Sequence, residues 1–393
     1  MDFRFTPQEE AFRQEVRDFI RREMPPDLGE GIGLEAAFEP GIWPTVQELR
    51  KKLAARNWLA ISWPKEYGGM GESLIKQAIF REEMEYWRCP AIDPQAYQLG
   101  PAIIVHGTEE QKKRFLGGIA RAEDTWCQGF SEPNAGSDLA NIQTRAVQNG
   151  DDFLINGQKI WTSGAHLADY IHMLARTDPA APKHRGISYF LFSMKLPGIT
   201  VRPINQMDGG MGFNEVFFDN VRVPKEALFG ELNRGWYVAT TTLDFERANV
   251  AIVRSAAGRR ALDDLVEFCV KNGFNGRPPL ATVTLRHRAA ELAIETEVAR
   301  MLSYRVLWMQ NSGKVPNAEA SLAKVSAYEN YFKVAWLAME VLGLYGQLSP
   351  QTGRAPLNGR VYWTYLRSAC RVGGGSPEIQ RNIIAQRGLG LPR

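Results

Sequence analysis

The stretch TTTLDFERANVAIV, residues 240–253, predicts a helix with one unusual position. At spacings of i, i+4, i+7, i+11 and i+14, one stripe of this helix consists of Ala239, Leu243, Glu246, Val250 and Val253. The carboxylate of Glu246 therefore shares an apolar face, and no Lys or Arg stands three or four positions from it. Burial raises the pKa of a carboxylate, and such a group is a candidate general base. The alternative is a helix Glu that reaches a partner elsewhere in the fold.

The composition argues against several classes of protein. The chain has 393 residues, 47 basic and 44 acidic side chains, a formal charge of +3 and 44% hydrophobic residues. Because the charges are spread along the chain, neither a nucleic-acid site nor a polybasic membrane anchor is expected. The four cysteines and five histidines lack metal-ligand spacing, so neither disulfides nor a metal site is predicted. No apolar run has the length of a membrane span, and we expect a soluble, cytoplasmic protein.

The character of the sequence changes twice, which predicts three domains. Residues 1–122 carry helical spacings and helix caps, such as Thr6 and Thr108. Residues 123–230 consist of short Val-, Ile- and Phe-rich runs separated by turn signals such as Asn156-Gly157, which predicts an antiparallel β-domain. Residues 231–393 return to long helices and predict a four-helix-bundle-like domain. The predicted fold class is α+β multidomain, in the order α, β, α.

Three segments carry polar groups that suit a cofactor or substrate. The loop GFSEPNAGSDL, residues 129–139, bunches amides and hydroxyls suited to a phosphate or a polar heterocycle, although most such loops are only turns. The segment KIWTSG, residues 159–164, places an indole beside two hydroxyls, where it would flank a flat aromatic ring; a core Trp is the alternative. After three glycines, the cap Ser376 opens a helix whose N-terminus would bare N–H groups to an anion or a carbonyl oxygen, unless it is only a tight turn.

In combination these segments resemble the acyl-CoA dehydrogenase family. The motifs that carry the resemblance are GFSEPNAGSDL, NGQKIWTSG (156–164), LDFER (243–247) and GGSPEIQRNIIAQR (374–387). The resemblance covers essentially the whole chain, including the α–β–α order. It implies the acyl-CoA dehydrogenase fold and an FAD cofactor between the β-domain and the C-terminal helices.

The resemblance also implies roles for individual residues. Those expected to edge the flavin are Gln128, Phe130 and Ser131. Trp161 and Ser163 are expected to lie against the isoalloxazine ring. Those that match positions contacting the adenosine end of FAD are Ser376 and Glu378. Ser137 matches a position that contacts the CoA part of the substrate, and Asp244 matches another substrate-contacting position.

The implied activity is α,β-dehydrogenation of an acyl-CoA thioester to the trans-2-enoyl-CoA, with electrons passed to an electron-transferring flavoprotein. Many members keep the catalytic base in the C-terminal turn, where this chain has Gly374. A second group, which resembles isovaleryl- and long-chain acyl-CoA dehydrogenases, carries the base on the helix at the position of Glu246. We therefore expect Glu246 to be the base and the Gly374 backbone N–H to polarise the thioester carbonyl. Arg247 matches a family arginine important for activity.

Two regions depart from the family pattern. Where an Arg-x-x-Phe-Gly motif is usual, residues 271–279 read KNGFNGRPP, and where Gln-x-x-Gly-Gly-x-Gly is usual, residues 340–346 read EVLGLYG. In the family these motifs reach FAD bound in the neighbouring subunit. Either Lys271 or Arg277 substitutes, or a partner chain supplies the contacts, so both a homotetramer and a heterotetramer stay open. Two other interpretations are a flavin-dependent oxidase or monooxygenase of the same fold and a non-catalytic subunit.

Overall fold

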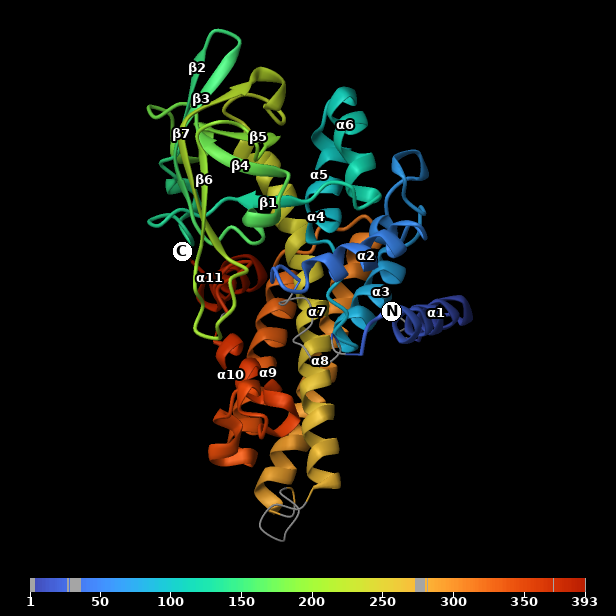
Figure 1. The fold of residues 1–393 in the computed structure, drawn as a ribbon. Helices are drawn as coiled ribbons and strands as arrows, with labels where there is room; N and C mark the ends of the chain where they lie inside the picture. The colour runs from blue at the N-terminus through green and yellow to red at the C-terminus, as the bar shows by residue number, and fades with distance from the viewer. Residues whose placement is uncertain are drawn as a thin grey trace. The chain divides into compact units, whose positions relative to one another are not determined.

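The computed structural model describes residues 4–26, 28, 37–272, 280, 282–369 and 371–392, without the side chains of residues 247–249. Along the chain, helices are followed by a sheet and then by further helices, the order that was predicted (Figure 1). The packing of the backbone forms two compact units, each built from separate segments. Unit 1 comprises Met1–Ala36, Glu72–Ile92 and Arg247–Arg393, and unit 2 comprises Ala37–Gly71 and Asp93–Glu246.

Unit 2 contains a seven-stranded sheet. Its strands are β1 (Trp126–Gly129), β2 (Arg145–Asn149), β3 (Asp152–Lys159), β4 (Tyr170–Arg176), β5 (Ile187–Ser193), β6 (Ile199–Pro203) and β7 (Asn214–Pro224). The order is β1-β4-β2-β3-β7-β6, with β5 paired to β4. Most pairs are antiparallel as predicted, but β4 runs parallel to β1 and meets β2 in parallel at one position. The sheet is therefore mixed. After β1 the chain first forms the β2–β3 hairpin, and β4 then returns to run beside β1 in the same direction.

The Asn156-Gly157 pair does not form a turn. It lies inside β3, where the pairing with β7 shifts register between Ile155 and Gly157. Gly157 has a φ of +148°, and a Cβ at this position would lie 2.5 Å from the Thr144 hydroxyl. The glycine therefore serves a β-bulge with close packing, while the β2–β3 hairpin closes at the next Asn-Gly pair upstream, Asn149-Gly150.

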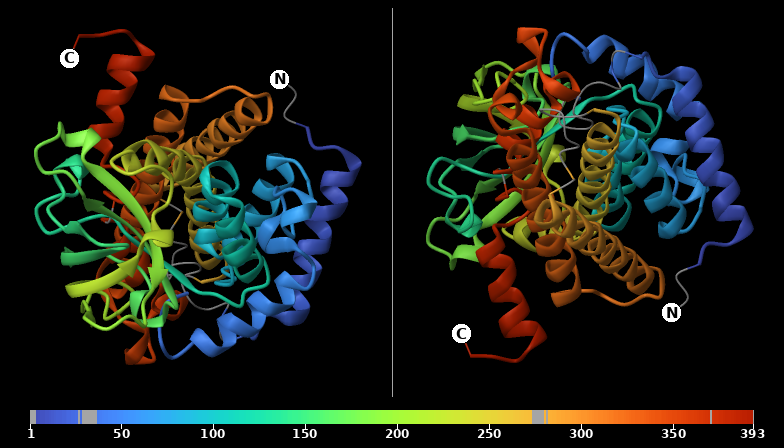
Figure 2. Two further views of the ribbon diagram at one scale, coloured as in Figure 1. Left: turned by 90° about the horizontal axis from the view of Figure 1, so that it is seen from above. Right: turned by 90° about the horizontal axis from the view of Figure 1, so that it is seen from below.

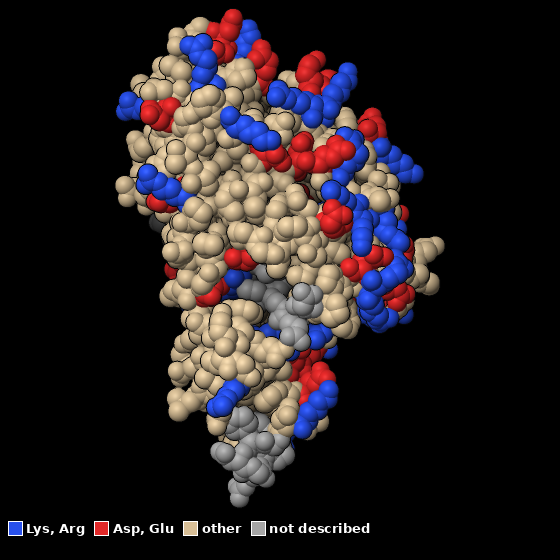
Figure 3. Space-filling view, in the orientation of Figure 1, with Lys and Arg blue, Asp and Glu red and all other residues tan. Residues whose placement is uncertain are grey.

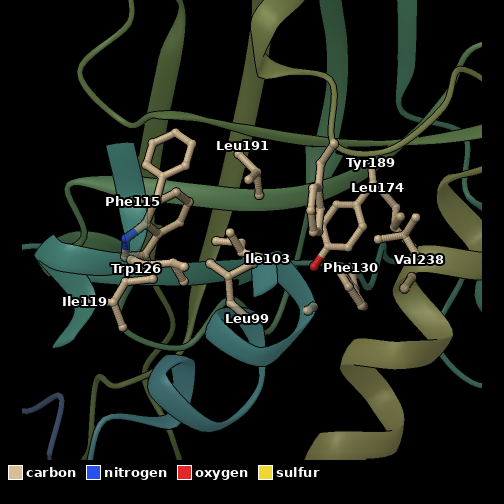
Figure 4. Packing of buried hydrophobic residues seen from close by; sticks show 14 of the residues in the cluster. Leu99, Ile103, Phe115, Ile119, Trp126, Phe130, Leu174, Tyr189, Leu191 and Val238 are labelled. Carbon is tan, nitrogen blue, oxygen red and sulfur yellow. The ribbon is translucent and has the colours of Figure 1, made fainter. Parts of the chain in front are cut away.

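Helices complete the core of unit 2. They are α2 (Trp43–Ala54), α4 (Pro94–Tyr97), α5 (Leu99–His106), α6 (Glu109–Ala120) and the first turns of α7 (Gly235–Lys271). The predicted cap Thr108 is confirmed, since its hydroxyl accepts the Gln111 N–H at 3.2 Å. Figure 4 shows the buried side chains that α5, α6, α7 and the strands share, among them Leu99, Ile103, Phe115, Trp126, Phe130, Leu174, Tyr189 and Val238. This core fixes the start of α7 against the sheet.

Unit 1 is helical. Besides the rest of α7, its helices are α1 (Pro7–Glu23), α3 (Leu74–Tyr86), α8 (Val283–Asn311), α9 (Ala318–Leu342), α10 (Arg360–Ser368) and α11 (Pro377–Ile383). The long helices α8 and α9 lie side by side (Figures 1 and 2). The predicted cap Thr6 forms a capping box with Glu9. Buried Glu82 on α3 accepts hydrogen bonds from Arg13 at 2.8 Å and Tyr304 at 2.9 Å, so charged groups join α1, α3 and α8.

Charges of both signs are intermixed on the face drawn in Figure 3. Within the described residues, no helix combines the length and the apolar character needed to cross a membrane. Over the same part of the chain, no group of three or more His, Cys, Asp and Glu side chains is arranged to hold a metal ion.

Candidate active site

The loop after β1 lies beside the end of β3, and both carry predicted cofactor residues. The backbone N–H of Ile160 donates to the carbonyl oxygen of Ser131 at 3.0 Å. The ammonium of Lys159 donates to the carbonyl oxygen of Phe130 at 3.2 Å and to the carboxylate of Glu132 at 2.8 Å. These bonds bring Phe130 and Ser131 next to the segment that continues into Trp161 and Ser163.

The ion pair between Lys159 and Glu132 is buried. The Glu132 carboxylate also accepts the N–H groups of Gln143 at 2.6 Å and Thr144 at 3.0 Å. Burial opposes ionisation of Glu132, but Lys159 and the two amides outweigh it and hold the pKa of the carboxyl below its usual value. Burial lowers the pKa of Lys159 to about 8, against the attraction of Glu132. We did not predict this pair, because a Lys before Ile-Trp looks like any strand-end lysine.

Trp161 adopts a backbone conformation that is rare for a bulky residue. Its φ is +59°, in the left-handed region, which costs on the order of 1–3 kcal/mol. The next residue helps to fix this conformation, because the Thr162 N–H donates to the Asn214 carbonyl oxygen at 3.0 Å. Trp161 is 56% exposed, and its ring lies at about a right angle to the Phe213 ring, with 6.0 Å between the ring centroids. The alternative of a core Trp is therefore wrong.

The exposed indole has polar neighbours, as a site for a flat heterocycle requires. Ser163 follows it in the chain, and Ser131 lies beside the same strand end; both are partly buried. Gln128, the penultimate residue of β1, is also partly buried. An aromatic face, hydroxyl groups and a strained backbone together are typical of a ligand clamp. These residues fit the isoalloxazine ring of FAD.

A chain of buried hydrogen bonds connects the sheet to α7. The two ring nitrogens of His172 bond the Gln95 amide oxygen at 2.8 Å and the Tyr189 hydroxyl at 2.6 Å. The Tyr189 oxygen lies 3.4 Å from the hydroxyl of Thr242 on α7. The Phe130 ring meets the His172 ring edge-on at 5.7 Å between centroids. It meets the Tyr189 ring in the same way at 5.5 Å, and Figure 4 shows these two side chains close together. We did not predict this chain, because its members come from four separate elements.

Glu246 lies on α7, one helical turn after Thr242, and is partly buried. Burial raises the pKa of the Tyr189 phenol, the hydrogen bond with Thr242 lowers it, and the negative charge of Glu246 raises it further. The rest of the predicted stripe is buried at Ala239 and partly buried at Leu243, Val250 and Val253. Asp244 is exposed. The side chain of Arg247 lies outside the described part of the chain.

The predicted C-terminal turn and cap are present in unit 1. Gly374 has a φ of +68°, which favours glycine. The Ser376 hydroxyl accepts the Ile379 N–H at 3.3 Å as the cap of α11, so one N–H group expected to meet a ligand is already bonded. Glu378 is exposed, and the hydrogen bonds of its own backbone N–H and of Ser376 lower the pKa of its carboxyl.

The predicted site residues thus fall into two sets. Unit 2 holds Gln128, Phe130, Ser131, Ser137, Trp161, Ser163, Asp244 and Glu246, and unit 1 holds Gly374, Ser376 and Glu378. Ser137 is exposed and comes later in the loop after β1 than the residues bonded to the end of β3. Of the two residues considered as substitutes for the family arginine, Lys271 pairs with Glu267 at 2.5 Å, and Arg277 lies outside the described residues.

Comparison with known proteins defines the family. Models of the acyl-CoA dehydrogenase N-terminal, middle and C-terminal domains match residues 6–123, 127–221 and 233–389. Acyl-CoA dehydrogenase IpdE1 of Mycobacterium tuberculosis is 37% identical over 98% of both chains. The chain belongs to the acyl-CoA dehydrogenase family of FAD-dependent oxidoreductases.

Two solved structures support this assignment. One is described as the ChsE4-ChsE5 complex from Mycobacterium tuberculosis, and the other as the Tcur3481-Tcur3483 steroid ACAD. Each is 34% identical to this chain, covers 100% of both chains and superposes with a TM-score of 0.89. The predicted three-part fold, with helices before and after a β-domain, is therefore confirmed.

Proposed function

We propose that the protein oxidises an acyl-CoA thioester to its trans-2-enoyl-CoA, with Glu246 as the base. The observation that carries this proposal is that only one of the family's two base positions holds a carboxylate. The position in the C-terminal turn is Gly374, whereas the position on α7 is the partly buried Glu246. A chain with this family's cofactor segments needs one base for the α-proton.

In the proposed reaction, the Glu246 carboxylate accepts the α-proton of the thioester. The Gly374 N–H donates to the thioester carbonyl oxygen, where negative charge develops as the C–H bond breaks. Ser137 contacts the CoA part of the substrate. Asp244 is a further substrate contact, and Arg247 is the arginine that the family needs for activity. When bound, FAD would supply the acceptor for the β-hydrogen with its electron pair, and the two electrons would then be passed to an electron-transferring flavoprotein.

The chain's own residues hold that cofactor in the proposal. Trp161 and Ser163 lie against the ring, and the ring's edge is bounded by Gln128, Phe130 and Ser131. Ser376 and Glu378 contact the adenosine end. The strained backbone and the exposed side chain of Trp161 support its assignment to the flavin ring. Contacts with a bound ligand would offset the energy that the left-handed backbone costs.

Replacement of the base tests the proposal. Glu246→Gln removes the proton acceptor at nearly constant volume. We therefore expect turnover of acyl-CoA with an artificial electron acceptor to fall at least about 100-fold, while the FAD content stays at the wild-type level. Glu226→Gln, at an exposed position of the same unit, is the matched control and should retain activity. Wild-type-like turnover by Glu246→Gln would show that the base lies elsewhere.

We further propose that the acyl group is bulky or branched. Gly374 brings no side chain to the turn, which leaves room for a large acyl group beside the carbonyl. One structural neighbour is described as a steroid ACAD, which supports a substrate class of this size. Flavin bleaching by a panel of straight, branched, aromatic and steroid-side-chain acyl-CoAs tests this proposal; bleaching by straight chains alone would contradict it.

Finally, we propose that the protein works with a related partner chain. The segments at 271–279 and 340–346 lack the family residues that reach FAD in a neighbouring subunit, and a close structural neighbour is described as a complex of two named chains. Expressed alone, the protein should bind well below one FAD per chain while giving a folded circular dichroism spectrum. Full FAD occupancy and activity in a homo-oligomer would contradict this proposal.

A further inference from the structure

A buried lysine of unit 1 contacts the glycine turn from the inside. Lys324 on α9 is fully buried, and its ammonium donates to the carbonyl oxygens of Arg371 and Gly375, both at 2.7 Å. The ammonium also lies over the Tyr328 ring, 4.3 Å from the centroid. A buried ammonium is costly unless carbonyl dipoles or a π face compensate for lost hydration, and here both do. Lys324 thus joins the two ends of the segment that contains Gly374.

Further hydrogen bonds fix the middle of this turn. The Gln380 amide donates to the Gly374 carbonyl oxygen at 3.2 Å, and the Gly375 N–H donates to the Val372 carbonyl oxygen at 3.1 Å. With the two bonds from Lys324, four of the five carbonyl groups from residue 371 to residue 375 are held by donors of unit 1. Among the backbone hydrogen bonds of the described residues, none has the Gly374 N–H as its donor.

From this pattern we infer that Lys324 is a positioning residue for the reaction. It holds the 371–375 turn so that the Gly374 N–H keeps one direction and stays available to the thioester oxygen. This role rests on the proposed function of Gly374. A donor that is already oriented costs no reorganisation when charge develops on the oxygen, whereas a donor on a loose glycine turn must be ordered first. Three consecutive glycines make the turn dependent on such outside contacts, because glycine restricts the backbone least.

Lys324→Met tests the inference, since it keeps most of the side-chain volume and removes every donor. We expect FAD content to stay at the wild-type level, kcat to fall on the order of 10- to 100-fold, and KM to change little. Amide hydrogen exchange in peptides covering 371–376 should become about 10-fold faster or more. Lys333→Met is the matched control: the same helix carries it, its side chain is half exposed, and it pairs with Glu295 at 2.9 Å. This control should leave both measurements unchanged.

A second variant covers the case in which Lys324→Met does not fold. Gln380→Leu removes the bond to the Gly374 carbonyl oxygen and leaves Lys324 in place, so exchange at 371–376 and kcat should shift in the same directions by smaller factors. Unchanged exchange and unchanged kcat in the folded variants would overturn the inference. The exchange measurement needs no substrate, so it decides the role of Lys324 in the turn even for an inactive protein. Wild-type protein that oxidises no acyl-CoA although its FAD site is fully occupied would instead overturn the proposed function.

Discussion

His172 shows how one buried residue makes the molecule sensitive to acid. Both of its ring nitrogens are bonded inside unit 2, one to the Gln95 amide oxygen and one to the Tyr189 hydroxyl. The amide oxygen can only accept, so the nitrogen facing it carries the proton and the other nitrogen accepts from the phenol. Burial disfavours the cation and lowers the pKa of His172 to about 3. The ring is therefore neutral at neutral pH.

This low pKa predicts a loss of stability in weak acid. In the unfolded chain a histidine titrates near pH 6.5, so between about pH 3 and 6.5 the unfolded state binds a proton that the folded state does not. Stability therefore rises with pH through this window and is lost as pH falls, by up to about 1.4 kcal/mol per pH unit. Urea unfolding of wild type and His172→Gln from pH 7.5 to pH 5 measures the slope. In His172→Gln, the free energy of unfolding should change less steeply with pH, by an amount that corresponds to nearly one bound proton. His287→Gln, at an exposed site, should show the wild-type slope. Equal slopes in all three proteins would contradict the prediction.

Between elements, the Lys159–Glu132 pair joins the end of β3 to the loop after β1. Removal of one partner leaves the other charge buried, so we expect Lys159→Met to lower the free energy of unfolding by about 3–5 kcal/mol. Lys159→Met with Glu132→Gln should lose less than the sum of the two single changes, because no charge is then left alone. Lys183→Met breaks the exposed pair with Asp138, which has the same 2.8 Å separation, and should cost at most about 1 kcal/mol. Urea titrations measure all four variants, and similar losses for the buried and exposed pairs would contradict this explanation.

The elements that sequence patterns predicted are those with local causes. Thr6 and Thr108 cap their helices as expected, because a cap needs only residues within one turn. Asn156-Gly157 was misassigned because its glycine serves a bulge against Thr144, a contact that no local pattern reveals. At the candidate site, the family resemblance implied a ring-flanking Trp161, but the left-handed backbone of this residue depends on a bond from Thr162 to the distant Asn214. The burial of Lys159 likewise depends on tertiary packing.

At the scale of the whole molecule, packing follows different boundaries from composition. The sequence changes character after residues 122 and 230, which predicts three domains. Each of the two compact units combines separate segments of the chain, and residues 72–92 belong to the same unit as the C-terminal helices. In unit 1, Glu82 on α3 pairs with Arg300 and accepts a hydrogen bond from the Tyr304 hydroxyl. Ala78 on α3 belongs to the same buried apolar cluster as Ile252 on α7. The C-terminal helices therefore rely on a segment that precedes the sheet in the chain.

This arrangement predicts the behaviour of a fragment. Residues 231–393 expressed alone lack α1 and α3, so the partly buried Arg300 and the buried Tyr304 lose the Glu82 carboxylate, and an apolar face of α8 meets water. We expect helical far-ultraviolet circular dichroism but a broad thermal transition and weak near-ultraviolet signal. Glu82→Gln in the full chain is the control, because it removes only the charge and should keep a cooperative, earlier transition. A fragment that melts cooperatively with a native-like near-ultraviolet spectrum would favour the three-domain division, since each domain would then carry its own core.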